Sequence, residues 1–88
     1  MNRRNLRIDS KDNVAVMLEK SCAGDTTIVD GVEITLNSDI EFAHKVALKD
    51  FSVGDPIYKY GEIIGNATVQ IQQGDWIHDH NIAYEQWK

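Results

Sequence analysis

Apolar and polar positions alternate over short stretches for most of the chain, and a period of two residues is typical of β-strands. Residues 14–18 (VAVML) predict a short strand whose two faces are both covered. Residues 26–29 (TTIV) and 32–36 (VEITL) flank Asp30-Gly31, a dipeptide that suits the positive φ angles of a two-residue hairpin turn. The first part of the chain therefore predicts one strand followed by a β-hairpin.

The middle and the end of the chain continue this pattern. Residues 40–48 (IEFAHKVAL) predict a strand with Phe42, His44 and Val46 on its apolar face and Lys45 on the other. Further strands are expected at 57–60 and 62–71, on either side of Gly61, and at 76–81. VGDP predicts a turn before the first of them and QQGD a turn before the last. We find no convincing helical stripe, no repeat and no low-complexity segment. The fold class predicted is all-β, with many short strands separated by glycine turns.

The length of 88 residues suffices for a single domain. Residues 1–10 are polar and charged without a period and predict a flexible N-terminal arm, which leaves residues 11–88 as the domain. A chain this short buries a modest fraction of its surface. Its core must therefore be economical or be extended by a partner, and a homo-oligomer is left open.

Charge and cysteine content exclude several function classes. The net charge is −5, and the basic residues form no patch beyond NRRNLR near the start, so nucleic acid is not an expected partner. The single cysteine, Cys22, cannot form an internal disulfide or a thiolate metal site alone, which fits a reducing compartment. The apolar runs are too short to span a bilayer, and no export signal follows the basic start. We expect a cytoplasmic protein with no membrane partner.

The stretch from residue 43 to residue 81 contains HKVAL (44–48), KYGEIIG (59–65), a glycine turn before the last strand, and a histidine pair followed by Asn81. In these motifs it closely resembles the small SAF domain of the altronate and galactarate dehydratase family. DNVAV (12–16) fits the usual opening of that domain. Two positions depart from the family pattern. Ala43 stands where glycine is usual, and Asp79 stands between the paired histidines where an apolar residue is usual.

The resemblance implies a compact β-clip fold and a much larger companion domain that carries most of the active site. Because the chain ends soon after Asn81, we expect the split form, in which this module is a separate small subunit beside a large dehydratase subunit. The small subunit is expected to be inactive alone. The resemblance also implies Fe²⁺ or Mn²⁺ as the cofactor, held mainly by the large subunit or shared with it.

The histidine pair His78 and His80 is the first candidate for chemistry. On a strand the two side chains would share a face, roughly 6.5–7 Å apart. Both rings could then converge on one metal ion or one substrate, as ligands or as proton-transfer groups, with Trp76 shielding them from water. The alternative is a pair of polar residues at a chain end.

Four further residues are candidates, each with a structural alternative. His44 is either catalytic or a hydrogen-bonded core residue. Lys45 either neutralises a substrate carboxylate or is solvated. Lys59 and Tyr60 either receive a polyhydroxy acid or take part in ordinary cross-strand packing.

The function implied is the small subunit of a metal-dependent hydro-lyase that converts an altronate-like sugar acid to a 2-keto-3-deoxy acid. Such dehydration removes the weakly acidic proton next to a carboxylate and expels the neighbouring hydroxyl, so the enolate-like intermediate must be stabilised. Two alternatives stay open. One is the small subunit of a sulfolactate sulfo-lyase, and the other is a non-catalytic SAF module for binding or assembly.

Overall fold

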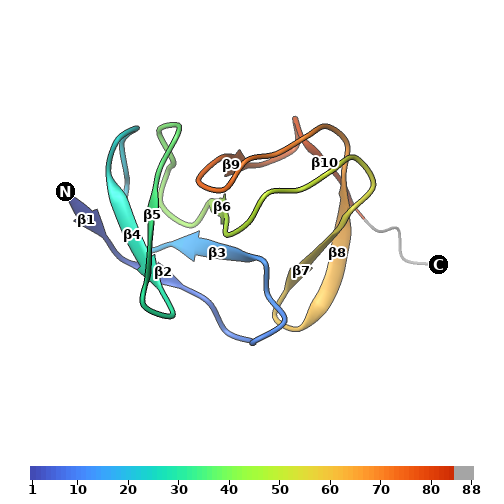
Figure 1. The fold of residues 1–88 in the computed structure, drawn as a ribbon, viewed down its shortest axis with the longest axis horizontal. Coiled ribbons are helices and arrows are strands. Elements are labelled where there is room, and N and C mark those ends of the chain that lie inside the picture. Colours follow the sequence, from blue (N-terminus) through green and yellow to red (C-terminus); the bar gives the residue numbers. More distant parts are fainter. Residues whose placement is uncertain (85–88) are drawn as a thin grey trace.

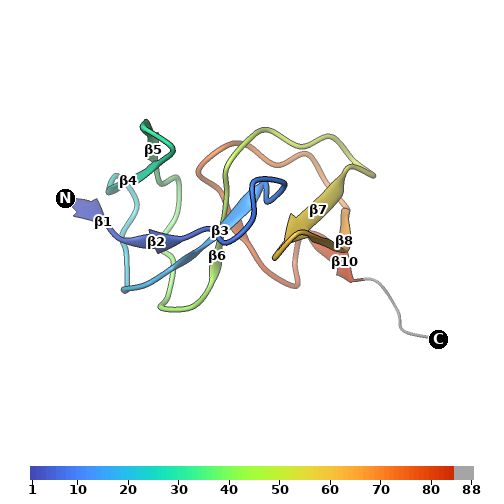
Figure 2. The same ribbon diagram turned by 90° about the horizontal axis from the view of Figure 1, so that it is seen from below.

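A computed structural model describes residues 1–84 of the chain (Figures 1 and 2). Within these residues there are ten short strands and no helix, so the predicted all-β class is confirmed. The strands are β1 (Asn2–Arg3), β2 (Asn5–Leu6), β3 (Val14–Met17), β4 (Thr26–Val29), β5 (Val32–Thr35), β6 (Lys45–Ala47), β7 (Pro56–Lys59), β8 (Glu62–Ala67), β9 (Trp76–Ile77) and β10 (Ile82–Tyr84). Accordingly, no helix in this part of the chain could cross a membrane.

The strands form three small sheets. Their orders are β1-β4-β5, β2-β3-β6-β9 and β10-β8-β7. In Figure 1 the first sheet lies at the left, the third at the right, and the strands β3, β6 and β9 lie between them. The pairing of β1 with β4 is parallel, and the other pairings within the sheets are antiparallel. The radius of gyration, 12.1 Å, is that of a compact domain of this length.

Two hairpins confirm the turns predicted from glycine. Asp30 and Gly31 have φ angles of 50° and 79° between β4 and β5. Tyr60 and Gly61 have φ angles of 57° and 79° between β7 and β8. Positive φ at both central positions is typical of the two-residue turn that matches the twist of paired strands.

The apolar side chains form two adjoining clusters on either side of β3. Val14 belongs to the cluster made with strands β6 to β10, whereas Ala15 and Met17 belong to the cluster that contains Leu36 and Val46. Successive side chains of a strand point to opposite faces, which explains this division. The prediction that both faces of this strand are covered is confirmed.

The same type of turn occurs at four places, residues 21–25, 40–44, 51–55 and 71–75. In each, the last residue donates its N–H to the carbonyl oxygen three residues earlier, at 2.9–3.1 Å, and the fourth residue has a positive φ angle. In three of the turns the last residue is an aspartate whose carboxylate also accepts the N–H three residues earlier (Asp25, Asp55, Asp75). In the turn at 40–44 that position is His44.

The turns mark two similar halves, which the sequence analysis did not detect. Bridges join residue 21 to residue 40 and residue 51 to residue 71, and each bridge closes a segment that contains one hairpin. Gly24-Asp25 and Gly31 recur 30 positions later as Gly54-Asp55 and Gly61. The side chains between these positions differ in character, which conceals the repeat.

Two predictions about residues 1–48 are wrong. Residues 41–44 form a turn with Phe42 63% exposed, so the strand expected over 40–48 is limited to Lys45–Ala47. A turn was not expected there because Ala43, and not glycine, has the positive φ angle. Residues 1–10 were expected to be a flexible arm, but residues 2–6 supply β1 and β2, which pair with β4 and β3. Backbone pairing and ion pairs hold this polar segment, and neither produces a hydrophobic period.

Candidate functional site

The three histidines of the chain gather around Trp76 at the end of the central sheet. β6 and β9 are antiparallel, with Lys45 opposite Ile77 and Val46 opposite Trp76. This register brings His44, just before β6, beside His78, just after β9. β9 is the last strand of the sheet order, so the cluster lies along an edge of the described sheet.

His44 and Trp76 lie edge to edge, and His78 lies against both. The indole Nε1–H of Trp76 donates a hydrogen bond to Nδ1 of His44 at 3.1 Å, while the two ring planes differ by only 18°. The His78 ring centroid is 4.7 Å from that of His44 and 5.3 Å from that of Trp76, each at an interplanar angle of 12°. All three side chains are partly buried. These contacts fix the ring positions before any ligand arrives.

His80 contacts the cluster differently. Its ring centroid is 4.8 Å from that of Trp76 at an interplanar angle of 41°, and the residue is exposed. The expectation that His78 and His80 share one face of a strand is wrong, because β9 ends at Ile77 and residues 78–81 form a turn. Trp76, and not a common strand, brings the two histidines to one place.

Asn81 holds this turn, a role that sequence reasoning did not assign. The residue is 5% exposed, and its Oδ1 accepts the backbone N–H of His78 at 3.0 Å. Its Nδ2 donates to the carbonyl oxygen of Trp76 at 2.9 Å, and its own N–H donates to the carbonyl oxygen of His78 at 3.1 Å. The only signal in the sequence was its place directly after the histidine pair.

Lys45 lies beside the cluster with its ammonium group near Tyr84. Its Nζ is 5.8 Å from the centre of the Tyr84 ring. Burial and the charge of Lys59 lower the pKa of Lys45, and the charge of Asp79 acts in the opposite direction. Burial and the same carboxylate raise the pKa of Tyr84. Asp79, on the turn with the histidines, therefore belongs to this charged group.

Lys59 and Tyr60 lie next to each other, at the end of β7 and in the following turn. The Nζ of Lys59 is 4.9 Å from the centre of the Tyr60 ring, and Tyr60 is 53% exposed. Lys59 is linked to the site through Lys45, whose pKa its charge lowers. No described contact joins Tyr60 to the histidine cluster.

The described residues do not form a complete metal site. Within residues 1–84 there is no group of three histidine, cysteine, aspartate or glutamate side chains placed to hold a metal ion. His78 and His80 could supply two imidazoles, and Nε2 of His78 is 4.0 Å from a carboxylate oxygen of Asp79. The remaining ligands of an iron or manganese ion would have to come from outside residues 1–84.

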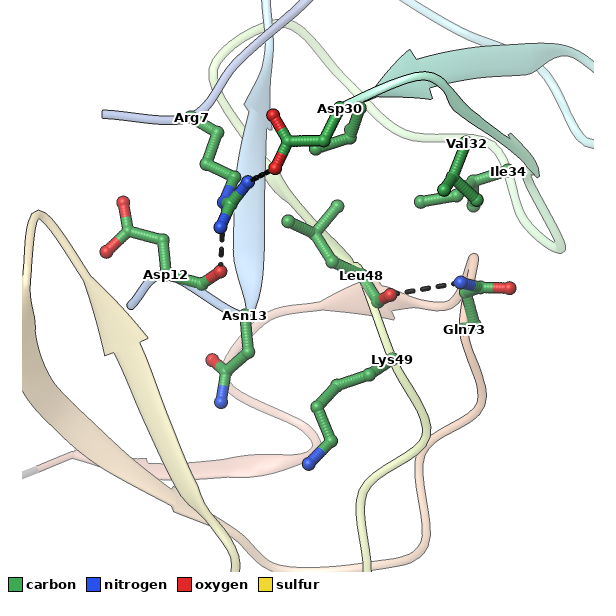
Figure 3. A pocket seen from close by; sticks show the side chains of 10 residues that line it. Arg7, Asp12, Asn13, Asp30, Val32, Ile34, Leu48, Lys49 and Gln73 are labelled. Carbon is green, nitrogen blue, oxygen red and sulfur yellow. Dashed lines mark hydrogen bonds and ion pairs between the residues drawn. The ribbon is translucent and has the colours of Figure 1, made fainter. Parts of the chain in front are cut away.

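A separate hollow of about 280 Å³ lies between the first two sheets and contains none of the candidate residues (Figure 3). Arg7 on its wall forms an ion pair with Asp30 and donates to the backbone oxygen of Asp12. Gln73 likewise donates to the carbonyl oxygen of Leu48 at 3.0 Å. The side chains of Arg7 and Gln73 thus already have partners within the protein.

Comparison with known proteins gives consistent matches. The family model described as the altronate/galactarate dehydratase SAF domain matches residues 3–85. Altronate dehydratases of Escherichia coli (strain K12) and Bacillus subtilis (strain 168) are 40% and 38% identical over 76 residues, 86% of this chain and 15% of each relative. The (2R)-sulfolactate sulfo-lyase subunit alpha of Paracoccus pantotrophus is 39% identical over 54 residues, 61% of this chain and 81% of that subunit. The chain thus spans about 15% of the length of these altronate dehydratases.

Proposed function

The chain belongs to the altronate/galactarate dehydratase SAF domain family, and on this premise we propose that it is the small subunit of a sugar-acid dehydratase. The substrate in this proposal is an altronate-like acid, the product is a 2-keto-3-deoxy acid, and the partner is a large dehydratase subunit. We place this activity in the cytoplasm.

The observation that carries the proposal is the cluster of His44, His78 and His80 around Trp76, with Lys45 beside it. Imidazoles are suited to proton transfer near neutral pH, and an ammonium group is suited to a carboxylate. The cluster lies on a sheet edge, where a second polypeptide could complete the site. The match to a sulfo-lyase subunit alpha, of which 81% is covered, supports a separate small subunit.

The proposed reaction divides into two proton movements. A base takes the proton from the carbon next to the carboxylate, and the neighbouring C–O bond breaks as the hydroxyl group leaves with a proton as water. The resulting enol then becomes the 2-keto-3-deoxy acid. In this proposal His78 and His80 donate or accept these protons, and His44 contributes a hydrogen bond. Lys45 binds the carboxylate, and Lys59 and Tyr60 contact the hydroxyl-bearing chain.

The cofactor proposed is Fe²⁺ or Mn²⁺, held mainly by the large subunit. When bound, such an ion stabilises the negative charge that develops on the carboxylate of the substrate. His78 and His80 could contribute at most two of its ligands. We assign no step of the reaction in this chain to the ion.

A second candidate function is the small subunit of a sulfolactate sulfo-lyase. It is favoured by one observation, the 81% coverage of the P. pantotrophus subunit alpha, compared with 15% of the altronate dehydratases. The two functions share the proton removal and differ in the leaving group, which departs as sulfite in one case and as water in the other.

The proposal predicts that the chain alone does not turn over altronate, whereas the chain in complex with a large dehydratase subunit does. His78→Ala and His80→Ala should each lower the kcat of the complex on the order of 10² or more, as expected for loss of a general acid or base. The double variant should cost little more than the worse single one, because residues that act as a unit are not additive.

Two results would contradict this proposal. Sulfite release from sulfolactate, with altronate and galactarate untouched, would replace the first function by the second. Full activity of the double variant at saturating large subunit would show that the pair is not part of the reaction. Asn66→Ala, in β8, is the control for a change of polar surface away from the cluster.

A further inference from the structure

We infer that Trp76 is a positioning residue: it holds His44 with Nδ1 unprotonated and Nε2–H directed outward, so that His44 acts as a hydrogen-bond donor and not as a base or a metal ligand. The donor role rests on the proposed function. The protonation pattern rests on the geometry of the two side chains alone.

The chemistry of the two rings determines the pattern. An indole N–H can donate a hydrogen bond but cannot accept one. The 3.1 Å contact from Nε1 of Trp76 to Nδ1 of His44 therefore requires a free lone pair on Nδ1. A neutral imidazole then carries its proton on Nε2. A proton on Nδ1 would direct two N–H groups at each other and break this contact.

Neither nitrogen of His44 is then available to accept a proton or to bind a metal ion. Nδ1 is occupied by Trp76, and Nε2 carries a hydrogen and has no lone pair for a metal ion or a proton. The ring is also held by His78, whose centroid is 4.7 Å away in a nearly parallel plane. What the ring can offer a ligand is the Nε2–H bond.

Comparison with the other three turns indicates that His44 is not needed for the local fold. Asp25, Asp55 and Asp75 use their carboxylates to accept a backbone N–H of their own turn. His44 occupies the equivalent position, but its side chain contacts Trp76 and His78 instead. The turn at 40–44 thus lacks a side-chain hydrogen bond that its three counterparts have, while the His44 ring is part of the histidine cluster.

An outward N–H of a neutral histidine suits the charge that develops during dehydration. As the proton leaves the carbon next to the carboxylate, negative charge accumulates on oxygen, and a fixed donor stabilises it without reorganisation. A neutral imidazole serves as such a donor in known isomerases. The base must then be another group, either His78, His80 or a residue of the large subunit.

The first test needs no activity. In the uniformly ¹⁵N-labelled chain, a two-bond ¹⁵N–¹⁵N coupling should be detected across the hydrogen bond between Nε1 of Trp76 and Nδ1 of His44. His44 should show the nitrogen shifts of the Nε2–H tautomer. Trp76→Phe keeps an aromatic ring without the N–H and should abolish the coupling. A protonated Nδ1 in the folded chain would overturn the inference whether or not the chain is a dehydratase subunit.

The second test measures the kcat of the complex with the large subunit. It uses two substitutions of His44 by an amide side chain, each of which mimics one nitrogen of the imidazole ring. His44→Asn keeps an acceptor near Nδ1 but loses the outward donor, and should lower kcat on the order of 10². His44→Gln presents an amide N–H near Nε2 and should retain at least about tenfold more kcat than His44→Asn. Trp76→Phe should lower kcat on the order of tenfold with little change in KM, as for loss of a group that orients a functional histidine.

The outcomes distinguish the protonation pattern of His44 from its role in the reaction. Equal losses in both amide variants would overturn the donor role, since neither amide is a base or a good metal ligand. Normal kcat in Trp76→Phe would overturn the positioning role. The ¹⁵N coupling without turnover of any acid would reject the proposed function and the donor role, and would leave the protonation pattern of His44 established.

Discussion

Ala43 has a backbone conformation that its side chain disfavours. Its φ angle is 70°, whereas the equivalent position in each of the other three turns is a glycine. The left-handed conformation costs an L-residue roughly 1–2 kcal/mol, and the greater freedom of unfolded glycine offsets about 0.4–1 kcal/mol. Ala43→Gly should therefore raise the free energy of unfolding by up to about 1.5 kcal/mol. Urea unfolding followed by fluorescence measures this change.

The reverse substitution provides a matched control. Gly54 occupies the same position of the turn at 51–55 with a φ angle of 91°, and an added Cβ would have no atom within 4 Å. Gly54→Ala should lower the free energy of unfolding by about 1 kcal/mol through backbone strain alone. If Gly54→Ala behaves so and Ala43→Gly does not stabilise, the Ala43 methyl group has compensating contacts.

The sequence identified all three histidines at the residue scale but not what joins them. An H-x-H pair and a lone histidine can be recognised from residue types, whereas their common neighbour depends on the pairing of β6 with β9. That pairing links residues that are 30 positions or more apart, such as Val46 and Trp76. Trp76 in turn lies two positions before His78. No local period encodes it. Trp76 was therefore expected to be a shield, and its hydrogen bond to His44 could not be foreseen.

At the scale of elements, the hairpins were predictable and the turns without glycine were not. Asp30-Gly31 and Gly61 mark their turns because few other residues adopt positive φ angles readily. Residues 40–44 and 78–81 contain no glycine, and their alternating residue types also suit a strand. In the second case a buried side-chain amide replaces glycine as the feature that fixes the turn.

The turn at 78–81 should depend on the side chain of Asn81. Asn81→Ala removes one hydrogen bond to the N–H of His78 and one to the carbonyl oxygen of Trp76. It leaves both backbone groups without that partner, so a loss of roughly 2–3 kcal/mol in the free energy of unfolding is expected. The ¹H–¹⁵N spectrum should also show the backbone amide of His78 exchanging faster with solvent.

Asn66→Ala is the control for this prediction. Its Nδ2 donates a single hydrogen bond, to the carbonyl oxygen of Gly54 at 3.1 Å, at an exposed site. Its loss should cost about 1 kcal/mol or less. Equal effects of the two substitutions would contradict the claim that Asn81 fixes the turn on which His78 and His80 lie.

At the scale of the whole molecule, carboxylates connect segments that the strands alone would leave loosely joined. Asp12 is 5% exposed and accepts N–H groups of Gly61 and Asp9, which links the β7–β8 hairpin to the segment before β3. Asp25 accepts the N–H of Cys22 and pairs with Arg3 of β1 at 2.9 Å. The first residues are thereby part of the fold, although their sequence suggested an arm.

These carboxylates predict the direction of the response to acid. The backbone N–H of Cys22 and the Arg3 guanidinium lower the pKa of Asp25 to about 2. Burial alone would raise the pKa of Asp12, but its backbone N–H donors outweigh burial and lower it. An unfolded aspartate has a pKa of about 3.9. Because both folded values lie lower, the stability from these groups is fully present above about pH 4 and is lost as the pH falls toward 2.

Urea midpoints measured between pH 6 and pH 2 should therefore stay level at first and then fall steeply below about pH 4. Asp25→Asn should lower the midpoint at pH 6 and flatten the fall, because the asparagine side chain does not exchange a proton in this range. Glu33→Gln removes an exposed charge of β5 and is the control for the change in net charge. A midpoint that stays constant down to pH 2.5 would contradict the role of these carboxylates in joining the first strands to the rest of the fold.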